Sequence, residues 1–194
     1  MKNGGGNIVA DNKQPLSHHI AYMAQTDLLL PWFSALDNAL LGARLRGSIS
    51  TALQTKAKKL FVQVGLQGAE KKLPHQLSGG MRQRVALVRT LLEEKSIVLM
   101  DEPFSAVDTI TRFQLQTLAA NLLKKCTVLL VTHDPLEALR LADDIYILSG
   151  QPAKLDLILQ LENSAPRDIS DPVFTEHQVT LFQALMCASR GIDL

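Results

Sequence analysis

Two neighbouring carboxylates follow a short apolar run near the middle of this 194-residue chain. Asp101 and Glu102 come directly after the run IVLM at 97–100. A magnesium ion bound with a phosphorylated ligand takes hard oxygen ligands, and an adjacent carboxylate can orient or deprotonate an attacking water. The alternative is that the two carboxylates only cap and solvate the end of a strand. The pair therefore predicts either a metal-assisted hydrolytic site or an ordinary strand end.

A second group of residues could bind an anion. Ser78, Gly79 and Gly80 stand just ahead of a helix that is expected to run to about Glu94. Open N–H groups at a helix start, the positive end of the helix dipole and a serine hydroxyl together attract negative charge. The same serine would also serve as an ordinary N-cap without any ligand. Taken alone, this short stretch leaves both interpretations open.

A histidine follows the next apolar run. His133, within Thr132–Asp134, comes just after the run VLLV at 128–131. Such a histidine is either a structural side chain or a titratable group that works beside carboxylates. Because reactive groups collect at the carboxyl ends of parallel strands, we expect His133 to lie near Asp101 and Glu102.

The elements that would position these groups alternate along the chain. Unbroken apolar runs lie at 97–100, 128–131 and 145–148. Runs of this kind are typical of strands that are covered on both faces. Helical patterns lie between them at about 110–124 and 135–142. The alternation predicts an α/β fold with a parallel sheet core and crossover helices.

The flanking regions differ in kind from this core. Residues of about 30–76 carry Ala, Leu, Lys and Gln at helical spacing and predict a small helical subdomain. Residues 77–150 are the expected catalytic half, and 151–194 are expected to form a C-terminal strand and helix. We expect a single domain over 1–194.

Composition argues against several classes of protein. The chain has 20 Lys and Arg against 19 Asp and Glu, a net charge of +1, so it lacks the basic field of a nucleic-acid partner. No uncharged apolar run reaches the roughly 20 residues of a membrane-spanning helix, and the N-terminus lacks the apolar core of a secretory signal. Cys126 and Cys187 are too few for a disulfide framework and are expected to be small core residues.

With its motifs in view, the region of about 20–150 resembles the ATPase subunits of ATP-binding-cassette (ABC) transporters. The matching motifs are, in chain order, the Q-loop segment YMAQ at 22–25, the signature LSGGMRQR at 77–84, the Walker B strand IVLMDE at 97–102, the D-loop SAVD at 105–108 and the switch histidine His133. All five stand in the order of the family at similar separations. The resemblance implies a P-loop NTPase-like ABC ATPase domain that uses ATP and Mg²⁺.

The resemblance gives a catalytic or metal-binding role to four residues. Glu102 would be the general base that polarises water, and His133 would contact the γ-phosphate. Asp101 would hold Mg²⁺, partly through water. Gln25 would reach the metal or its water and report the nucleotide state to a membrane partner. Catalysis would then consist largely of positioning and charge stabilisation.

The implied nucleotide-binding residues come from several motifs. They are Gln25, Ser78, Gly79, Gly80, Gln83 and Asp108. Because the family works as a head-to-tail dimer, the serine and the two glycines would grip ATP that is bound to the opposite subunit. Asp108 would cross the dimer interface.

One part of the family pattern is not seen. Glycine is nowhere followed by lysine, so a GxxxxGK[ST] loop that cradles the β- and γ-phosphates is not found, and the run 4–6 is expected to be a mobile terminus or a turn. Residues 1–19 resemble the stretch that follows this loop. We therefore expect an N-terminally shortened, incomplete cassette with exposed apolar surface at its sheet edge. We also expect weak or absent ATP hydrolysis by the chain alone, while its signature could still complete a partner's site.

The stretch QTDLLLPW at 25–32 resembles the importer branch that serves nitrate, sulfonates, taurine and thiamine precursors. Together with LLGARLRG at 40–47, the longer stretch AYMAQTDLLLPW at 21–32 is most similar to subunits for thiamine precursors such as hydroxymethylpyrimidine. The implied partners are a second ATPase subunit, permease subunits and, indirectly, a solute-binding protein. The implied place is the cytoplasmic face of the inner membrane, or the cytosol if the chain is unassembled.

Two alternatives remain open at this point. The first is a non-hydrolysing regulatory or vestigial subunit of the same family. The second is an ABC protein of DNA repair or translation, which the balanced charge and the short chain disfavour.

Overall fold

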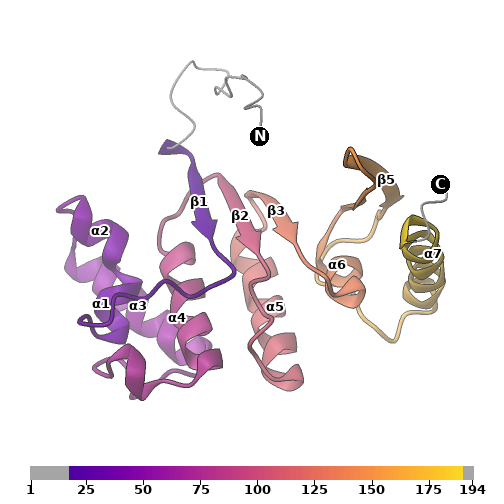
Figure 1. Cartoon of the computed structure of the whole chain (residues 1–194). Helices are drawn as coiled ribbons and strands as arrows, with labels where there is room; N and C mark the ends of the chain where they lie inside the picture. Colours follow the sequence, from indigo (N-terminus) through magenta and orange to yellow (C-terminus); the bar gives the residue numbers. More distant parts are fainter. Residues whose placement is uncertain (1–17, 190–194) are drawn as a thin grey trace. The chain divides into compact units, whose positions relative to one another are not determined.

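The computed structural model describes residues 18–189 (Figure 1). The chain divides into two compact units. The first holds the described residues up to Asp108 together with Leu123–Leu129, and the second holds Thr109–Leu122 and the described residues from Leu130 onward. No helix in the described part of the chain is both long and apolar enough to span a bilayer.

A short sheet begins in the first unit. β1 (Ile20–Met23) pairs in parallel with β2 (Ile97–Asp101), and β3 (Thr127–Val131) completes the order β1-β2-β3. The strands predicted at 97–100 and 128–131 are confirmed. The predicted parallel pairing is confirmed as well. β1 was not predicted, because it is a short run in which only Ala21 and Met23 are buried.

The prediction that β3 is covered on both faces is wrong. Val128 and Leu129 are 40% and 60% exposed. A strand buries its faces only where other elements pack against them, and β3 is the outermost strand in the order β1-β2-β3. Its apolar side chains therefore lie on exposed surface.

Helices fill the rest of the first unit and gather beside β1 in Figure 1. They are α1 (Ala35–Ala39), α2 (Leu41–Leu45), α3 (Thr51–Gln63), the 3₁₀ turn Pro74–Gln76 and α4 (Gly79–Leu91). α1 and α3 pack on α4, which buries Val85 and Val88 completely. The elements between 30 and 76 are all helical, and the boundaries of the expected helical subdomain stay a prediction.

Serine residues fix where three of these helices begin. The hydroxyls of Ser34, Ser50 and Ser78 each accept a hydrogen bond from the N–H three residues further on, at 3.1, 3.1 and 3.2 Å. Such N-caps satisfy one of the open donors of the first turn. The cap at Ser78 sets the start of α4, and with it the position of the two glycines that follow.

The second unit has its own sheet and core. Its elements are α5 (Thr109–Leu123), α6 (Pro135–Leu141), β4 (Asp144–Ser149), β5 (Lys154–Gln160) and α7 (Pro172–Ser189). The core of this unit consists of Leu139, Ile145, Ile147, Leu161, Phe174, Leu181 and Ala184. α7 packs on α6, β4 and β5. The helices predicted at about 110–124 and 135–142 and the C-terminal strand and helix are confirmed.

The third predicted strand does not join the parallel sheet. β4 pairs with β5 in an antiparallel sheet of two strands. Ile145 and Ile147 are buried, whereas Tyr146 and Leu148 are 48% and 70% exposed. Because only one face of this sheet is covered, its apolar run behaves as a half-buried antiparallel strand.

Candidate functional site

The first N–H groups of α4 have no carbonyl acceptor within the helix. Ser78 Oγ accepts from the N–H of Met81, and the first intrahelical bond runs from the N–H of Arg82 to the carbonyl oxygen of Ser78 at 2.9 Å. The N–H groups of Gly79 and Gly80 precede that bond and are left for an outside acceptor. The N-cap interpretation of Ser78 is thus confirmed, and the anion site at the glycines stays a prediction.

The two glycines differ in what surrounds them. A Cβ atom added to Gly80 would lie 2.9 Å from the carbonyl oxygen of Ala106 and 3.7 Å from Val107 Cα. A Cβ atom added to Gly79 would meet only a guanidinium nitrogen of Arg82, at 3.9 Å. Gly80 therefore lets α4 approach the backbone of the segment after β2, a packing role that the sequence did not reveal. Gly79 faces open space.

Asp101 and Glu102 lie at the end of β2, with both side chains partly exposed. Glu102 has a φ of +47°, in the left-handed region that side chains other than glycine rarely adopt. The next two residues, Pro103 and Phe104, are buried and anchor the turn. A backbone held in this region costs about 1–3 kcal/mol and persists only where its surroundings enforce it, which is commonest at functional sites.

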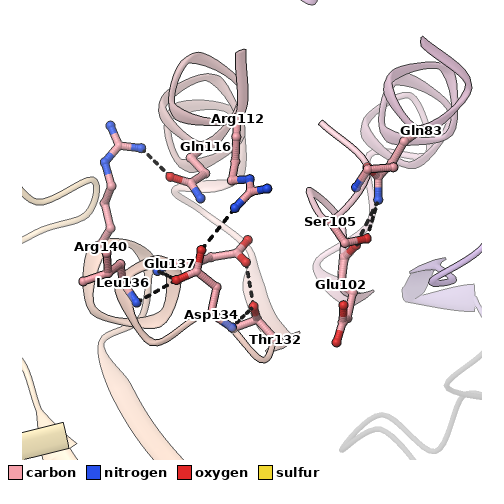
Figure 2. A network of polar contacts seen from close by, with 11 residues as sticks. Gln83, Glu102, Ser105, Arg112, Gln116, Thr132, Asp134, Leu136, Glu137 and Arg140 are labelled. Carbon is pink, nitrogen blue, oxygen red and sulfur yellow. Dashed lines mark hydrogen bonds and ion pairs between the residues drawn. The ribbon is translucent and has the colours of Figure 1, made fainter. Parts of the chain in front are cut away.

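Gln83 connects α4 to this turn. Its Nε2 donates to the carbonyl oxygen of Glu102 at 3.0 Å and to Ser105 Oγ at 3.3 Å (Figure 2). Its Oε1 accepts from the N–H of Ala106 at 2.8 Å. The side chain is buried, with only 5% exposure. The sequence placed Gln83 among the nucleotide-binding residues, whereas its amide is directed at the protein backbone.

Arg84 links α4 to the end of α3, and Asp108 acts on its charge. Arg84 donates to the carbonyl oxygens of Val64 at 2.9 Å and Gly65 at 3.2 Å, at the end of α3. Burial lowers the pKa of the Arg84 guanidinium, and the negative charge of Asp108 opposes that shift. Asp108 itself is exposed, as a residue that reaches another subunit must be.

The segment after Gln25 is fixed to α4 by two arginines. Arg82 Nε donates to Asp27 Oδ2 at 2.9 Å, and Arg89 donates to the backbone oxygens of Asp27 at 2.7 Å and Leu28 at 3.1 Å. Burial lowers the pKa of Arg89, and Asp27 opposes the shift. Gln25 is exposed beside this anchored segment. Sequence reasoning missed Asp27. The one indication in the sequence was its position two residues after Gln25, a glutamine that was expected to be functional.

His133 belongs to the second unit, between two anchored neighbours. Thr132 Oγ1 donates to Glu137 Oε2 at 2.6 Å and accepts from the N–H of Asp134 at 3.0 Å (Figure 2). Asp134 caps α6 and pairs with Arg112 at 3.3 Å. His133 itself is exposed. Its expected proximity to Asp101 and Glu102, in the first unit, stays a prediction.

The residues of the first unit fit a magnesium nucleotide better than a metal bound by protein ligands alone. Among residues 18–189, no group of three or more His, Cys, Asp or Glu could hold an ion. Magnesium bound with nucleotides takes one or two carboxylates, and the phosphates and waters complete its shell. Asp101 with Glu102 supplies such a pair, and the open N–H groups of Gly79 and Gly80 suit a phosphate oxygen.

Comparisons with known proteins identify the family of the chain. The family model described as ABC transporter matches residues 2–105. An uncharacterized ABC transporter ATP-binding protein of Haemophilus influenzae is 45% identical over 169 residues, which cover 86% of this chain and 70% of that protein. An aliphatic sulfonates import ATP-binding protein, SsuB 1 of Rhodococcus jostii, is 41% identical over 88% of this chain and 67% of that protein.

Solved structures give the same result for the fold. A dimeric ATP-binding cassette, MJ0796, in a post-hydrolysis state with ADP and Pi, matches with a TM-score of 0.61 and 30% identity. The match covers 75% of this chain and 66% of that one, so the chain spans about two thirds of the length of the solved cassette. The α/β fold with its parallel sheet is that of the cassettes. On these observations the chain belongs to the ABC transporter family, whose ATP-binding cassettes are ATPases.

Proposed function

We propose that this chain is the ATP-binding subunit of an ABC importer, coupling ATP binding and hydrolysis to the uptake of a small solute. The observation that carries the proposal is that α4 holds two other segments beside its own start, within one compact unit. The helix begins at Ser78, holds the turn after Glu102 through Gln83, and holds the segment after Gln25 through Arg82. Helix start, acidic turn and glutamine segment are the parts that a nucleotide site needs in fixed relation.

Each group has a chemical task in this proposal. Asp101 would hold Mg²⁺, and Glu102 would orient and deprotonate the attacking water. The N–H groups of Gly79 and Gly80 would donate to the γ-phosphate of ATP bound by a second cassette, because a helix start favours negative charge. Asp108 would lie at the interface with that cassette, and His133 would contact the γ-phosphate.

An exposed apolar surface supports a membrane partner for the first unit. Leu28 is 61% exposed and Trp32 is 69% exposed, and both lie in the segment that follows Gln25. Contiguous exposed apolar patches mark interaction sites, and these two side chains are candidates for part of such a patch. We propose that a cytoplasmic segment of a permease docks here, so that the position of Gln25 is passed to the membrane subunit.

The solute class follows from the relatives and from the branch that the sequence resembles. SsuB 1 and SsuB 2 of Rhodococcus jostii carry names for aliphatic sulfonate import and are 41% and 40% identical to this chain. The stretches at 21–32 and 40–47 resemble those of subunits for thiamine precursors. We propose a small organic solute of this range, chosen by the partner subunits. Uptake of a labelled sulfonate and of labelled hydroxymethylpyrimidine is measured in cells that lack the gene. The solute whose uptake is lost identifies the solute class.

Association with a second cassette tests the proposal most simply. The partner is a family member that carries a GxxxxGK[ST] loop and a general-base substitution that stops hydrolysis. Sedimentation is measured with MgATP and with MgADP. We expect a heterodimer with MgATP only, and a Gly79→Asp variant should fail to form it because the new carboxylate meets the phosphate. Association that ignores the nucleotide, or survives Gly79→Asp, would contradict the proposal.

A further inference from the structure

A buried amide holds the strained turn that carries Glu102. The carbonyl oxygen of Glu102 accepts from Gln83 Nε2 at 3.0 Å and from Ser105 Oγ at 3.1 Å. The N–H of Ser105 also points to it, at 3.4 Å. These donors surround the peptide of a residue whose φ is +47°. Because such a conformation persists only when its surroundings enforce it, Gln83 is part of what keeps Glu102 in place.

The orientation of the Gln83 amide is fixed by its partners. A backbone N–H can only donate, so the N–H of Ala106 requires the amide oxygen of Gln83 on that side, at 2.8 Å. The nitrogen must then face the carbonyl oxygen of Glu102. With 5% exposure, the side chain has almost no water to replace either partner. Gln83 therefore spans the turn from Glu102 to Ala106 as one brace.

A second contact ties the same two segments together. Gly80, within the helix start that is proposed to meet the partner's nucleotide, lies so close to Ala106 that an added Cβ would be 2.9 Å from its carbonyl oxygen. A shift of the start of α4 toward Ala106 therefore cannot occur without moving the segment 105–107. The side chain of Gln83 and the backbone contact of Gly80 act on the same turn from neighbouring turns of one helix.

We propose that Gln83 is a positioning residue that couples the start of α4 to Glu102. In this inference, which rests on the proposed function, Gly79 and Gly80 engage the nucleotide of the partner cassette while Glu102 serves the nucleotide of its own chain. Gln83 is the rigid connection between these two tasks. Binding at the partner's site then orders the base of this chain's site.

Three variants separate this role from general stability. Gln83→Met keeps the length and shape of the side chain but removes its hydrogen bonds, and Ser105→Ala removes a weaker donor from the same carbonyl without burying a new group. Gln54→Met, on the exposed face of α3, makes the matched change away from the turn. Unfolding midpoints show that each variant is folded at the temperature of the experiment.

The readout is amide hydrogen exchange of the full chain, alone and paired with a partner cassette in MgATP. Alone, we expect the amides of Ser105 and Ala106 to exchange about tenfold faster in Gln83→Met, as for the loss of one buried hydrogen bond. Ser105→Ala should show a smaller increase, and Gln54→Met none. In the pair, the amides of Gly79 and Gly80 should become protected in every variant. The amides of Glu102 and Phe104 should exchange more slowly on pairing in the wild type, and their exchange should not change on pairing in Gln83→Met.

Each outcome decides a different statement. Unchanged exchange at Ala106 in Gln83→Met overturns the inference, because the amide then holds nothing. Faster exchange with an intact response at Glu102 in the pair also overturns it, because Gln83 is then only a packing residue. If MgATP and the partner leave Gly79 and Gly80 unprotected in the wild type, the proposed function fails, and the exchange of the isolated chain still decides whether Gln83 braces the turn.

Discussion

Arg82 Nε donates to Asp27 Oδ2 at 2.9 Å, across 55 positions of sequence. The next residue of the same helix, Gln83, holds the turn after Glu102. Two consecutive side chains of α4 thus hold the two segments that are expected to sense a bound nucleotide. The start of α4 therefore connects these two segments, and the anion site at its glycines stays a prediction.

The pair of Arg82 and Asp27 should contribute measurably to the stability of the first unit. Their side chains are 36% and 28% exposed, so the attraction is partly screened by water. A double-mutant cycle with Arg82→Gln and Asp27→Asn, followed by urea unfolding, should give a coupling of about 0.5–1 kcal/mol. The coupling should shrink in high salt. Strictly additive effects of the two changes would contradict the pairing.

Alanine should have opposite effects at the two neighbouring glycines of α4. Gly80→Ala forces a Cβ to within 2.9 Å of a backbone oxygen, and such overpacking costs about 1–3 kcal/mol. Gly79→Ala adds its Cβ in open space and removes the flexibility of glycine, so it should be neutral or stabilise by up to about 1 kcal/mol. The two midpoints of urea unfolding give the comparison, and equal effects would show that α4 does not approach Ala106.

Arg140 should be a main stabilising side chain of the second unit. It donates to the carbonyl oxygen of Phe113 at 3.1 Å, to Gln116 Oε1 at 2.9 Å and to Thr117 Oγ1 at 2.7 Å, and it lies 3.4 Å from the centre of the Phe113 ring. Lysine cannot reproduce this fork. Arg140→Lys should destabilise by roughly 2–4 kcal/mol because buried partners lose their donors.

An exposed arginine supplies the control for Arg140. Arg44→Lys alters a surface ion pair with Asp37 and should change the free energy of unfolding by well under about 1 kcal/mol. Thermal unfolding of both variants makes the comparison. Equal losses of stability would mean that the hydrogen bonds from Arg140 to α5 do not stabilise the second unit.

Asp168 should make the second unit sensitive to acid. The backbone N–H of Ser170, at 2.9 Å, and its hydroxyl, at 2.8 Å, lower the pKa of Asp168 below its ordinary value of 3.8, with a smaller effect from Arg140. Because the pKa is lower in the folded state, the stabilisation is present above that ordinary value and is lost as pH falls through the folded pKa. Asp168→Asn should therefore cost stability at pH 7 and make little difference in strong acid. A constant difference across pH would contradict this.

The elements that the sequence predicted well have local signals. The cap at Ser78, the proline that opens α6 and the apolar period of α5 are properties of neighbouring residues. The apolar run of β4 does not indicate which strand it pairs with, because such a run looks the same in a parallel and in an antiparallel sheet. Its pairing with β5 could be learned only from the structure.

In the candidate site too, local motifs predicted some residues, whereas contacts between distant segments could not be predicted. Motif order was enough to select Ser78, Asp101 and Glu102 as candidates. The inward direction of Gln83 and the contact of Gly80 with Ala106 depend on how α4 lies against a turn some twenty residues further on. Such contacts follow from packing, which a single sequence does not encode by spacing.

Hydrolysis by a deliberately incomplete pair of cassettes shows whether the start of α4 serves ATP that is bound to a partner. The partner is a cassette with a GxxxxGK[ST] loop whose own signature serine and glycines have been inactivated, so that its ATP site needs a signature from outside. We predict that this chain restores MgATP turnover to the partner, that Gly79→Asp in this chain abolishes the rescue, and that Glu102→Gln in this chain leaves it largely intact. Failure of the folded wild-type chain to restore turnover, or rescue that survives Gly79→Asp, would contradict the account.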